Sequence, residues 1–226
     1  MASQRNLETK YRISETAMTL FLNQGYESVT VDSVAAASQV SRRTVFRYFA
    51  TKDELPFPDH SERIAELQRR LNDSAPDADA VESVIAATEE SLRDFLRRPE
   101  LVLSRYRLTR IVAELRSREV VEHERYVAVT TAYLRDRLPP DTPTFQPTAL
   151  AALIDAIHRA VLGDWARSGG NTNAQNELEA GMDWVRGLVP DGSPHSDEQF
   201  LLAVLPDNPR VRRTIGGLRD AARETL

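Results

Sequence analysis

Apolar residues recur every three or four positions along most of this chain, and that spacing predicts helices. The first such segment, 7–23, is followed by Gly25, which suits a left-handed stop. Two short segments and a third interrupted by Pro56 and Pro58 come next, and longer segments fill the remainder. The expected helices are 7–23, 31–38, 42–49, 59–71, 77–98, 100–115, 117–138, 148–167, 174–188 and, after a linker at 191–194, 197–205 and 210–225. No segment alternates as a strand would, so the predicted fold class is all-α.

The helix boundaries near the N-terminus carry specific capping signals. Thr30 and Ser41 directly precede the second and third helices, where a hydroxyl accepts a hydrogen bond from a free backbone amide. Val40 and Val45 form a hydrophobic staple across the second of these caps, and Thr51 to Glu54 reads as a capping box for the next helix. Three short helices with a tight turn between the second and third predict a helix-turn-helix at the N-terminus.

Charge points to the same module. The chain of 226 residues carries a net charge of −5, yet positions 41–52 hold four cations and no acid. A local basic surface on an acidic protein favours contact with nucleic acid at that surface. The third helix should turn its outer side to base edges, and the helix starts and flanking residues should hold phosphates. The predicted DNA-binding residues are Thr30, Ser41, Arg42, Arg43, Thr44, Phe46, Arg47, Tyr48 and Lys52.

The stretch GYESVTVDSVAAASQVSRRTVFRYFATKDEL, at 25–55, resembles the signature of the TetR/AcrR family of transcriptional regulators. Three positions depart from that signature: Gln39 replaces the usual turn glycine, Arg43 a frequent glycine, and Phe46 a tyrosine. The resemblance implies a DNA-binding domain at 1–55, a larger helical domain at 56–226 that dimerises and binds a ligand, and a homodimer on a palindromic operator. A repressor released by its ligand is the expected mode of action, and no cofactor or metal is implied.

The larger domain offers candidates for both of its implied roles. Aromatic and histidine side chains on the middle helices, with one arginine, are the predicted ligand contacts: Phe95, Tyr106, Arg107, His123, Tyr126 and His158. Two late apolar helices, with Gly181 allowing a close approach, are expected to pair into a four-helix bundle through Ile157, Val161, Trp165, Leu178, Met182 and Val185. Residues 97–126, RRPELVLSRYRLTRIVAELRSREVVEHERY, resemble regulators of the mycofactocin type, which respond to long-chain acyl-CoA. The arginines there either pair along their helices or form the mouth of a site for an anionic ligand.

Other classes of protein fit the sequence poorly. The chain has no cysteine, no phosphate-binding glycine motif and no nucleophile elbow. Glu119 with His123, and Asp155 with His158, have the spacing of metal ligands on a helix, but isolated pairs of this kind are usually structural. A helical enzyme or a lipid-binding protein without a DNA function is thus the less favoured alternative. With neither an apolar run long enough to span a membrane nor a secretory signal, the expected location is the cytoplasm.

Overall fold

The computed structural model describes residues 2–188, and within this range the regular structure is helical throughout. The helices expected at 197–205 and 210–225 lie outside the described residues. The elements are α1 (Ala2–Gln24), α2 (Val31–Ala37), α3 (Arg42–Tyr48), a 3-10 turn η1 (Lys52–Glu54), α4 (His60–Asn72), α5 (Ala80–Leu96), α6 (Pro99–Ile111), α7 (Ala113–Arg137), α8 (Gln146–Arg167) and α9 (Ala174–Leu188). The all-α prediction is confirmed.

Helices α1 to α3, with the turn η1 that follows them, form a head with its own apolar core. Ile13, Met18 and Phe21 of α1 are almost fully buried, together with Val34 of α2 and Val45 of α3. Gly25 ends α1 as predicted, with a φ of 86° and its amide bonded to the carbonyl of Phe21 at 3.0 Å. The head thus rests on the short-range pattern that the sequence displays.

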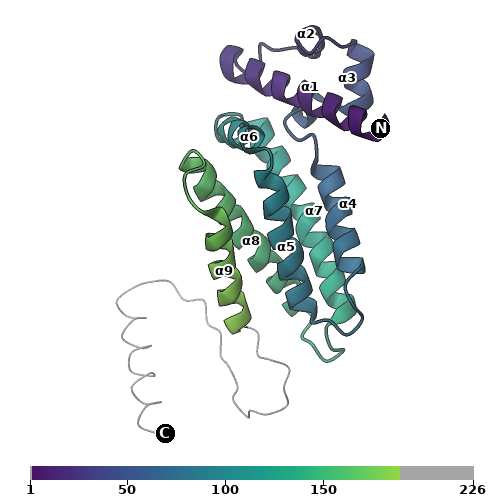
Figure 1. Ribbon diagram of the computed structural model, residues 1–226, viewed down its shortest axis with the longest axis vertical. Coiled ribbons are helices and arrows are strands. Elements are labelled where there is room, and N and C mark those ends of the chain that lie inside the picture. The colour runs from purple at the N-terminus through teal and green to yellow at the C-terminus, as the bar shows by residue number, and fades with distance from the viewer. Residues whose placement is uncertain (1, 189–226) are drawn as a thin grey trace, which may run out of the picture. The chain divides into compact units, whose positions relative to one another are not determined.

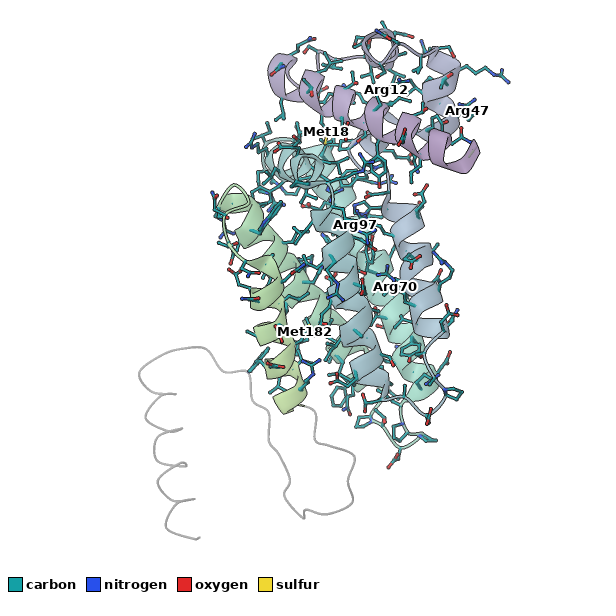
Figure 2. All side chains as sticks on the ribbon, in the orientation of Figure 1. Arg12, Met18, Arg47, Arg70, Arg97 and Met182 are labelled. Carbon is teal, nitrogen blue, oxygen red and sulfur yellow. The ribbon has the colours of Figure 1, made fainter. Side chains whose placement is uncertain are left out.

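The core of the head continues into the other helices. Leu101 and Leu108 of α6 and Leu115 of α7 belong to the same apolar cluster as the inner side of α1. Figure 1 shows α1 lying next to α6, and Met18, labelled in Figure 2, lies where the two helices face each other. Helix α6 therefore packs directly against the head.

The second apolar cluster joins α4, α5, α7, α8 and α9. Helices α7 and α8 pack together, and α9 covers α8 and α5. Gly181 of α9 sits so close to α8 that a Cβ added there would lie 2.4 Å from Cγ2 of Ile157. The close helix approach predicted for Gly181 is present, and it joins two helices of the same subunit.

Two local expectations at the end of the head are wrong. The Thr51 side chain makes no capping bond, and 52–54 is a single 3-10 turn instead of the start of a helix. The side chain of Glu54 instead accepts the amide of Ala50 at 2.6 Å. Helix α4 begins only at His60, because Pro56 and Pro58 lack the amides that a continuous helix needs. Helix α8 also begins slightly earlier than the helix expected at 148–167. Pro147, just outside that range, lies in the first turn of α8, where proline is well tolerated.

Candidate functional site

The starts of α2 and α3 are both capped as predicted. Thr30 Oγ1 accepts the amide of Ser33 at 3.1 Å, and Ser33 Oγ accepts the amide of Thr30 at the same distance. Ser41 Oγ accepts the amide of Thr44 at 3.1 Å and lies 2.9 Å from the Thr44 hydroxyl. Each helix therefore starts at a fixed place with further backbone amides pointing out of its first turn, an arrangement that suits a phosphate oxygen.

The outer side of α3 is cationic and exposed. Val45 faces the core of the head, whereas Arg42, Arg43, Phe46 and Arg47 lie at the surface. Arg42 pairs with Asp32 at 2.7 Å, and its guanidinium lies 5.4 Å from the ring centre of Phe46. Arg43 makes no hydrogen bond or ion pair with the part of the chain that the structure describes, so its five N–H donors remain available.

Arg47 and Tyr48 belong to a small surface network. Arg47 Nη2 donates to Tyr48 Oη at 3.0 Å, and that hydroxyl donates to Asn6 of α1 at 3.0 Å. Figure 2 marks Arg47 on α3. The network holds the end of α3 against the start of α1.

The structure places Lys52 differently from the other predicted contacts. Its ammonium donates to the carbonyl of Tyr26 and lies 4.1 Å from the Tyr26 ring centre and 5.7 Å from that of Phe21. These contacts tie η1 to the turn between α1 and α2. A direct contact of Lys52 with DNA stays a prediction, and it would have to compete with this internal role.

A cavity of about 340 Å³ lies between α4, α5, α6, α7 and α8. Of the residues predicted to contact a ligand, five line it: Phe95, Tyr106, His123, Tyr126 and His158. Arg107 does not, because it lies on the exposed side of α6. Two residues along a helix correspond to a turn of about 200°, so the inward arginine is Arg105, which is 5% exposed. The prediction of Arg107 is corrected to Arg105.

An ion-paired cluster lies at the buried end of the cavity. The carboxylate of Asp59 binds Arg63 at 2.5 Å and lies 3.8 Å from Arg105, and the Tyr11 hydroxyl of α1 donates to it at 3.3 Å. Burial alone would raise the pKa of Asp59, but the attraction of Arg63 and Arg105 outweighs it and the pKa is lowered from its usual value. The cluster therefore holds a charged carboxylate between the head and the cavity.

Two of the three histidines that line the cavity, His60 and His158, have lowered pKa values that favour the neutral ring. Burial, followed by repulsion from Arg105, places the pKa of His60 well below its ordinary value. Burial likewise lowers the pKa of His158 to about 4. Imidazole rings in this state can both donate and accept a hydrogen bond. The sequence placed His60 at the start of the helix expected at 59–71, but at a helix end directly after two prolines the periodicity gave no sign that it faces a cavity.

A second link between the head and the helical domain runs through Arg118 of α7. Its guanidinium lies 3.3 Å from Glu54 and 3.6 Å from Asp53 of η1, and 2.9 Å from Glu122, which is 2% exposed. Glu122 is also bound by Arg125 at 2.9 Å and lies 3.9 Å from His60. The arginine thus joins the last turn of the head to a buried carboxylate beside the cavity.

The residues predicted for a dimer interface lie mostly inside the subunit. Leu178, Met182 and Val185 of α9 are at most 1% exposed, and Val161 and Trp165 of α8 are 8% and 7% exposed. Ile157 is partly buried against Gly181. The apolar periodicity marked the face that α9 needs for its own subunit core, to which Met182, labelled in Figure 2, belongs. Buried side chains offer a partner no surface, so these residues are not available as the main contact between two subunits.

The pairs considered as metal ligands are engaged elsewhere. Glu119 binds Arg110 at 2.5 Å, and His123 Nδ1 lies 3.6 Å from the carboxylate of Asp155, which also binds Arg159 at 2.7 Å. Within 2–188, no three such side chains gather in a way that would hold a metal ion. Over the same residues, no helix combines the length and the apolar character needed to cross a membrane.

Comparison with known proteins agrees with the geometry of the head. Residues 13–56 match the model of the bacterial regulatory proteins of the tetR family. The chain is 28% identical over 176 residues, 73% of its length, to the Mycobacterium tuberculosis protein named as the putative mycofactocin biosynthesis transcriptional regulator MftR, covering 83% of that protein.

Solved structures extend the likeness of fold to the helical domain. The FadR repressor of Thermus thermophilus, solved in complex with lauroyl-CoA, superposes with a TM-score of 0.56 at 21% identity, over 84% of this chain and 100% of the other. The SmeT–triclosan complex gives a TM-score of 0.58 at 18% identity, over 87% and 100%. Residues 13–56 thus carry the helix-turn-helix of the bacterial regulatory proteins of the tetR family, and the all-helical chain as a whole is similar to transcriptional regulators of that family.

Proposed function

We propose that this protein is a ligand-released repressor that binds a palindromic operator as a homodimer in the cytoplasm. The observation that carries the proposal is the outer side of α3, where Arg43 is exposed and makes no ion pair within 2–188, on a helix fixed by the Ser41 cap and the buried Val45. A free guanidinium on a rigid helix is what bidentate recognition of guanine requires. Residues 1–55 form the DNA-binding domain in this proposal, and 56–226 the ligand-binding and dimerisation domain.

The predicted contacts divide into two kinds. Arg43, Thr44 and Phe46 are proposed to read bases, since they lie on the outer side of α3 and present a guanidinium, a methyl group and a ring. The remaining residues are proposed to hold phosphates and so fix the register of the helix: Thr30, Ser41, Arg42, Arg47, Tyr48 and Lys52.

The proposed dimer uses the exposed sides of α8 and α9. Trp184 of α9 is 55% exposed, and Ala180 lies on the same helix one turn earlier. On α8, the exposed residues Ala152, Ala156 and Ala160 follow each other at helical spacing and leave room for a close helix approach. A two-fold axis through such a face would present both heads to the same side of DNA, as an inverted repeat demands.

The cavity is the proposed effector site. It has the size and the mixed lining of a small-molecule pocket. The related fold of FadR was solved with lauroyl-CoA and that of SmeT with triclosan, so a small, largely apolar molecule, with acyl-CoA-like compounds as one class, is proposed as the effector.

Coupling to the head is proposed to run through residues 51–71. Asp59 binds Tyr11 of α1 on one side and lies 3.8 Å from Arg105 of the cavity on the other. A ligand that displaces Arg105 would alter the position of Asp59 and hence of α1. A coupling free energy of about 1–3 kcal/mol suffices to change operator affinity some 5- to 150-fold.

Selection of bound fragments from genomic DNA tests the DNA-binding part of the proposal. The wild-type chain should enrich an inverted repeat, and Arg43→Ala should lose about 1–3 kcal/mol of binding on that site and relax base preference within each half-site. Arg135→Ala, which removes the same charge from an exposed position near the end of α7, is the matched control and should keep the preference. Failure of the wild-type chain to enrich any sequence would contradict the proposal.

The ligand-release part has a separate test. Long-chain acyl-CoA is titrated into the protein with and without its operator, and its affinity should be lower in the presence of the operator by the same factor as the ligand weakens DNA binding. Equal affinities in the two titrations would refute the coupling, however tightly the ligand bound.

A further inference from the structure

The two ends of the cavity differ in exposure and in chemistry. At its mouth, Arg110, Arg116 and Arg159 are exposed. Arg110 and Arg159 bind Glu119 and Asp155, and Arg116 donates to the carbonyls of Thr109 and Arg110. The cations of the mouth are therefore already engaged by the subunit.

The opposite end, here called the inner wall, consists of His60, Arg105, Tyr126 and His158. His60 and Arg105 are 5% exposed, His158 is 9% exposed, and the Tyr126 hydroxyl is buried. Several of their polar atoms find no hydrogen-bond partner among the described residues: Nδ1 and Nε2 of His60, Nη1 of Arg105, Oη of Tyr126 and Nε2 of His158. Polar atoms buried without partners are costly, and a group of them lining one end of a cavity points to a polar group on the ligand.

The charges at the inner wall indicate which polar group of a ligand would bind there. Asp59 is bound directly by Arg63 at 2.5 Å, so Arg105, at 3.8 Å, is the less firmly paired of its two arginines. Three further carboxylates near the cavity have arginine partners: Glu122 is held by Arg118 and Arg125, Glu119 by Arg110, and Asp155 by Arg159. The unpartnered atoms of these four side chains belong to a cationic guanidinium, a phenol and two imidazoles, and Oδ1 of Asp59, also without a hydrogen-bond partner, lies 3.8 Å from Arg105 Nη1. A ligand acceptor with negative charge would hydrogen-bond the guanidinium that Asp59 reaches only at this longer distance.

The rest of the lining is apolar. Leu67, Phe95, Val102, Ile154 and Leu162 line the cavity. Such a surface favours a ligand with an apolar body. An acyl thioester entering tail first would place a terminal methyl group against the unpartnered atoms of the inner wall and leave them unsatisfied.

We propose that the effector is a compact apolar carboxylic acid that enters with its carboxylate toward Arg105 and Tyr126 and leaves its apolar body along Phe95 and Ile154. This inference rests on the proposed role of the cavity as the effector site and narrows the ligand class and its orientation. The carboxylate takes the place that a partner of Arg105 Nη1 would occupy, next to Asp59, which itself binds Tyr11 of the head. The Arg105 guanidinium would then both bind the ligand and, through Asp59 and Tyr11, change the contact with the head.

Three probes of equal chain length test the orientation: decanoate, 1-decanol and decanoyl-CoA. Each is titrated calorimetrically into the full-length protein. Decanoate should bind at least about tenfold more tightly than 1-decanol, because it alone supplies a charge-assisted bond to Arg105. Arg105→Met should weaken decanoate by about tenfold or more and leave 1-decanol unchanged, whereas Arg107→Met, on the exposed side of the same helix, should change neither.

Arg105 is buried and ion-paired, so a milder variant serves as a second test in case Arg105→Met does not fold. Tyr126→Phe removes only the hydroxyl and should weaken decanoate several-fold with an unchanged circular dichroism spectrum. Equal binding of decanoate and 1-decanol, tighter binding of decanoyl-CoA than of decanoate, or no binding of decanoate would each overturn the inference. Operator selection by the wild-type chain, measured separately, would show whether the proposed function fails with it.

Discussion

Replacing Gly181 by alanine should force α8 and α9 apart. The added Cβ would lie 2.4 Å from Cγ2 of Ile157, whereas carbon atoms in contact are separated by about 3.5–4.0 Å. The Cγ2 methyl group of Ile157 cannot rotate away, since the side chain of a β-branched residue in a helix is nearly confined to one rotamer. Either the helices separate or Ile157 adopts a strained rotamer.

The size of the effect follows from two opposing terms. Overpacking of this kind costs about 1–3 kcal/mol, and alanine in place of glycine within a helix returns about 0.5–1 kcal/mol. The free energy of unfolding should therefore fall by about 1 kcal/mol and by at most about 2.5 kcal/mol. Gly187, on the same helix, is the matched control, because no atom lies within 4 Å of a Cβ added there. Gly187→Ala should be neutral or stabilising.

Urea denaturation followed by circular dichroism, at one fixed protein concentration, measures both variants. A double-mutant cycle locates the cause: Ile157→Leu keeps the side-chain volume but moves the branch away from Cβ, so it should restore most of the stability lost in Gly181→Ala. If Gly181→Ala were as stable as Gly187→Ala, or if the cycle showed no coupling between 157 and 181, the close packing of α8 on α9 described here would be wrong.

Three further predictions concern the head, its link to the helical domain, and pH. Gln39 occupies the turn before α3 with a φ of 55°, so Gln39→Gly should raise stability by about 0.5–1 kcal/mol, the left-handed cost of about 1–2 kcal/mol less the entropy cost of glycine; a decrease on urea denaturation would contradict this. Arg118→Met leaves the buried Glu122 with Arg125 alone and should cost about 1–3 kcal/mol, against less than about 0.5 kcal/mol for the exposed Arg107→Met in the same assay. His158 is neutral when folded and has a pKa of about 4, so the unfolded chain takes up its proton first and stability falls as pH drops below about 6.5. Between pH 7 and pH 5 this should amount to about 2 kcal/mol, and denaturation of His158→Leu at both values should show a correspondingly smaller loss.

The sequence by itself determined the local structure of the head. Thr30 and Ser41 cap α2 and α3 as expected, and Gly25 ends α1, because these signals act within four residues of the chain. The bounds of α9 were likewise predictable from apolar periodicity. At Thr51 the same kind of reasoning failed, since two nearby prolines prevented the helix that its capping box requires.

Only the tertiary structure decided which partner each buried face meets. The apolar positions of α9 were recognised, but whether Met182 and Val185 covered their own subunit or another could not be read from their spacing. The inward position of Arg105 in place of Arg107, and the contacts of Arg118 with η1 and of Lys52 with Tyr26, depend on residues far apart in the sequence. Apolar periodicity indicates which side of a helix is buried. Which element packs against that side depends on long-range packing and charge pairing, and these cannot be derived from one sequence alone.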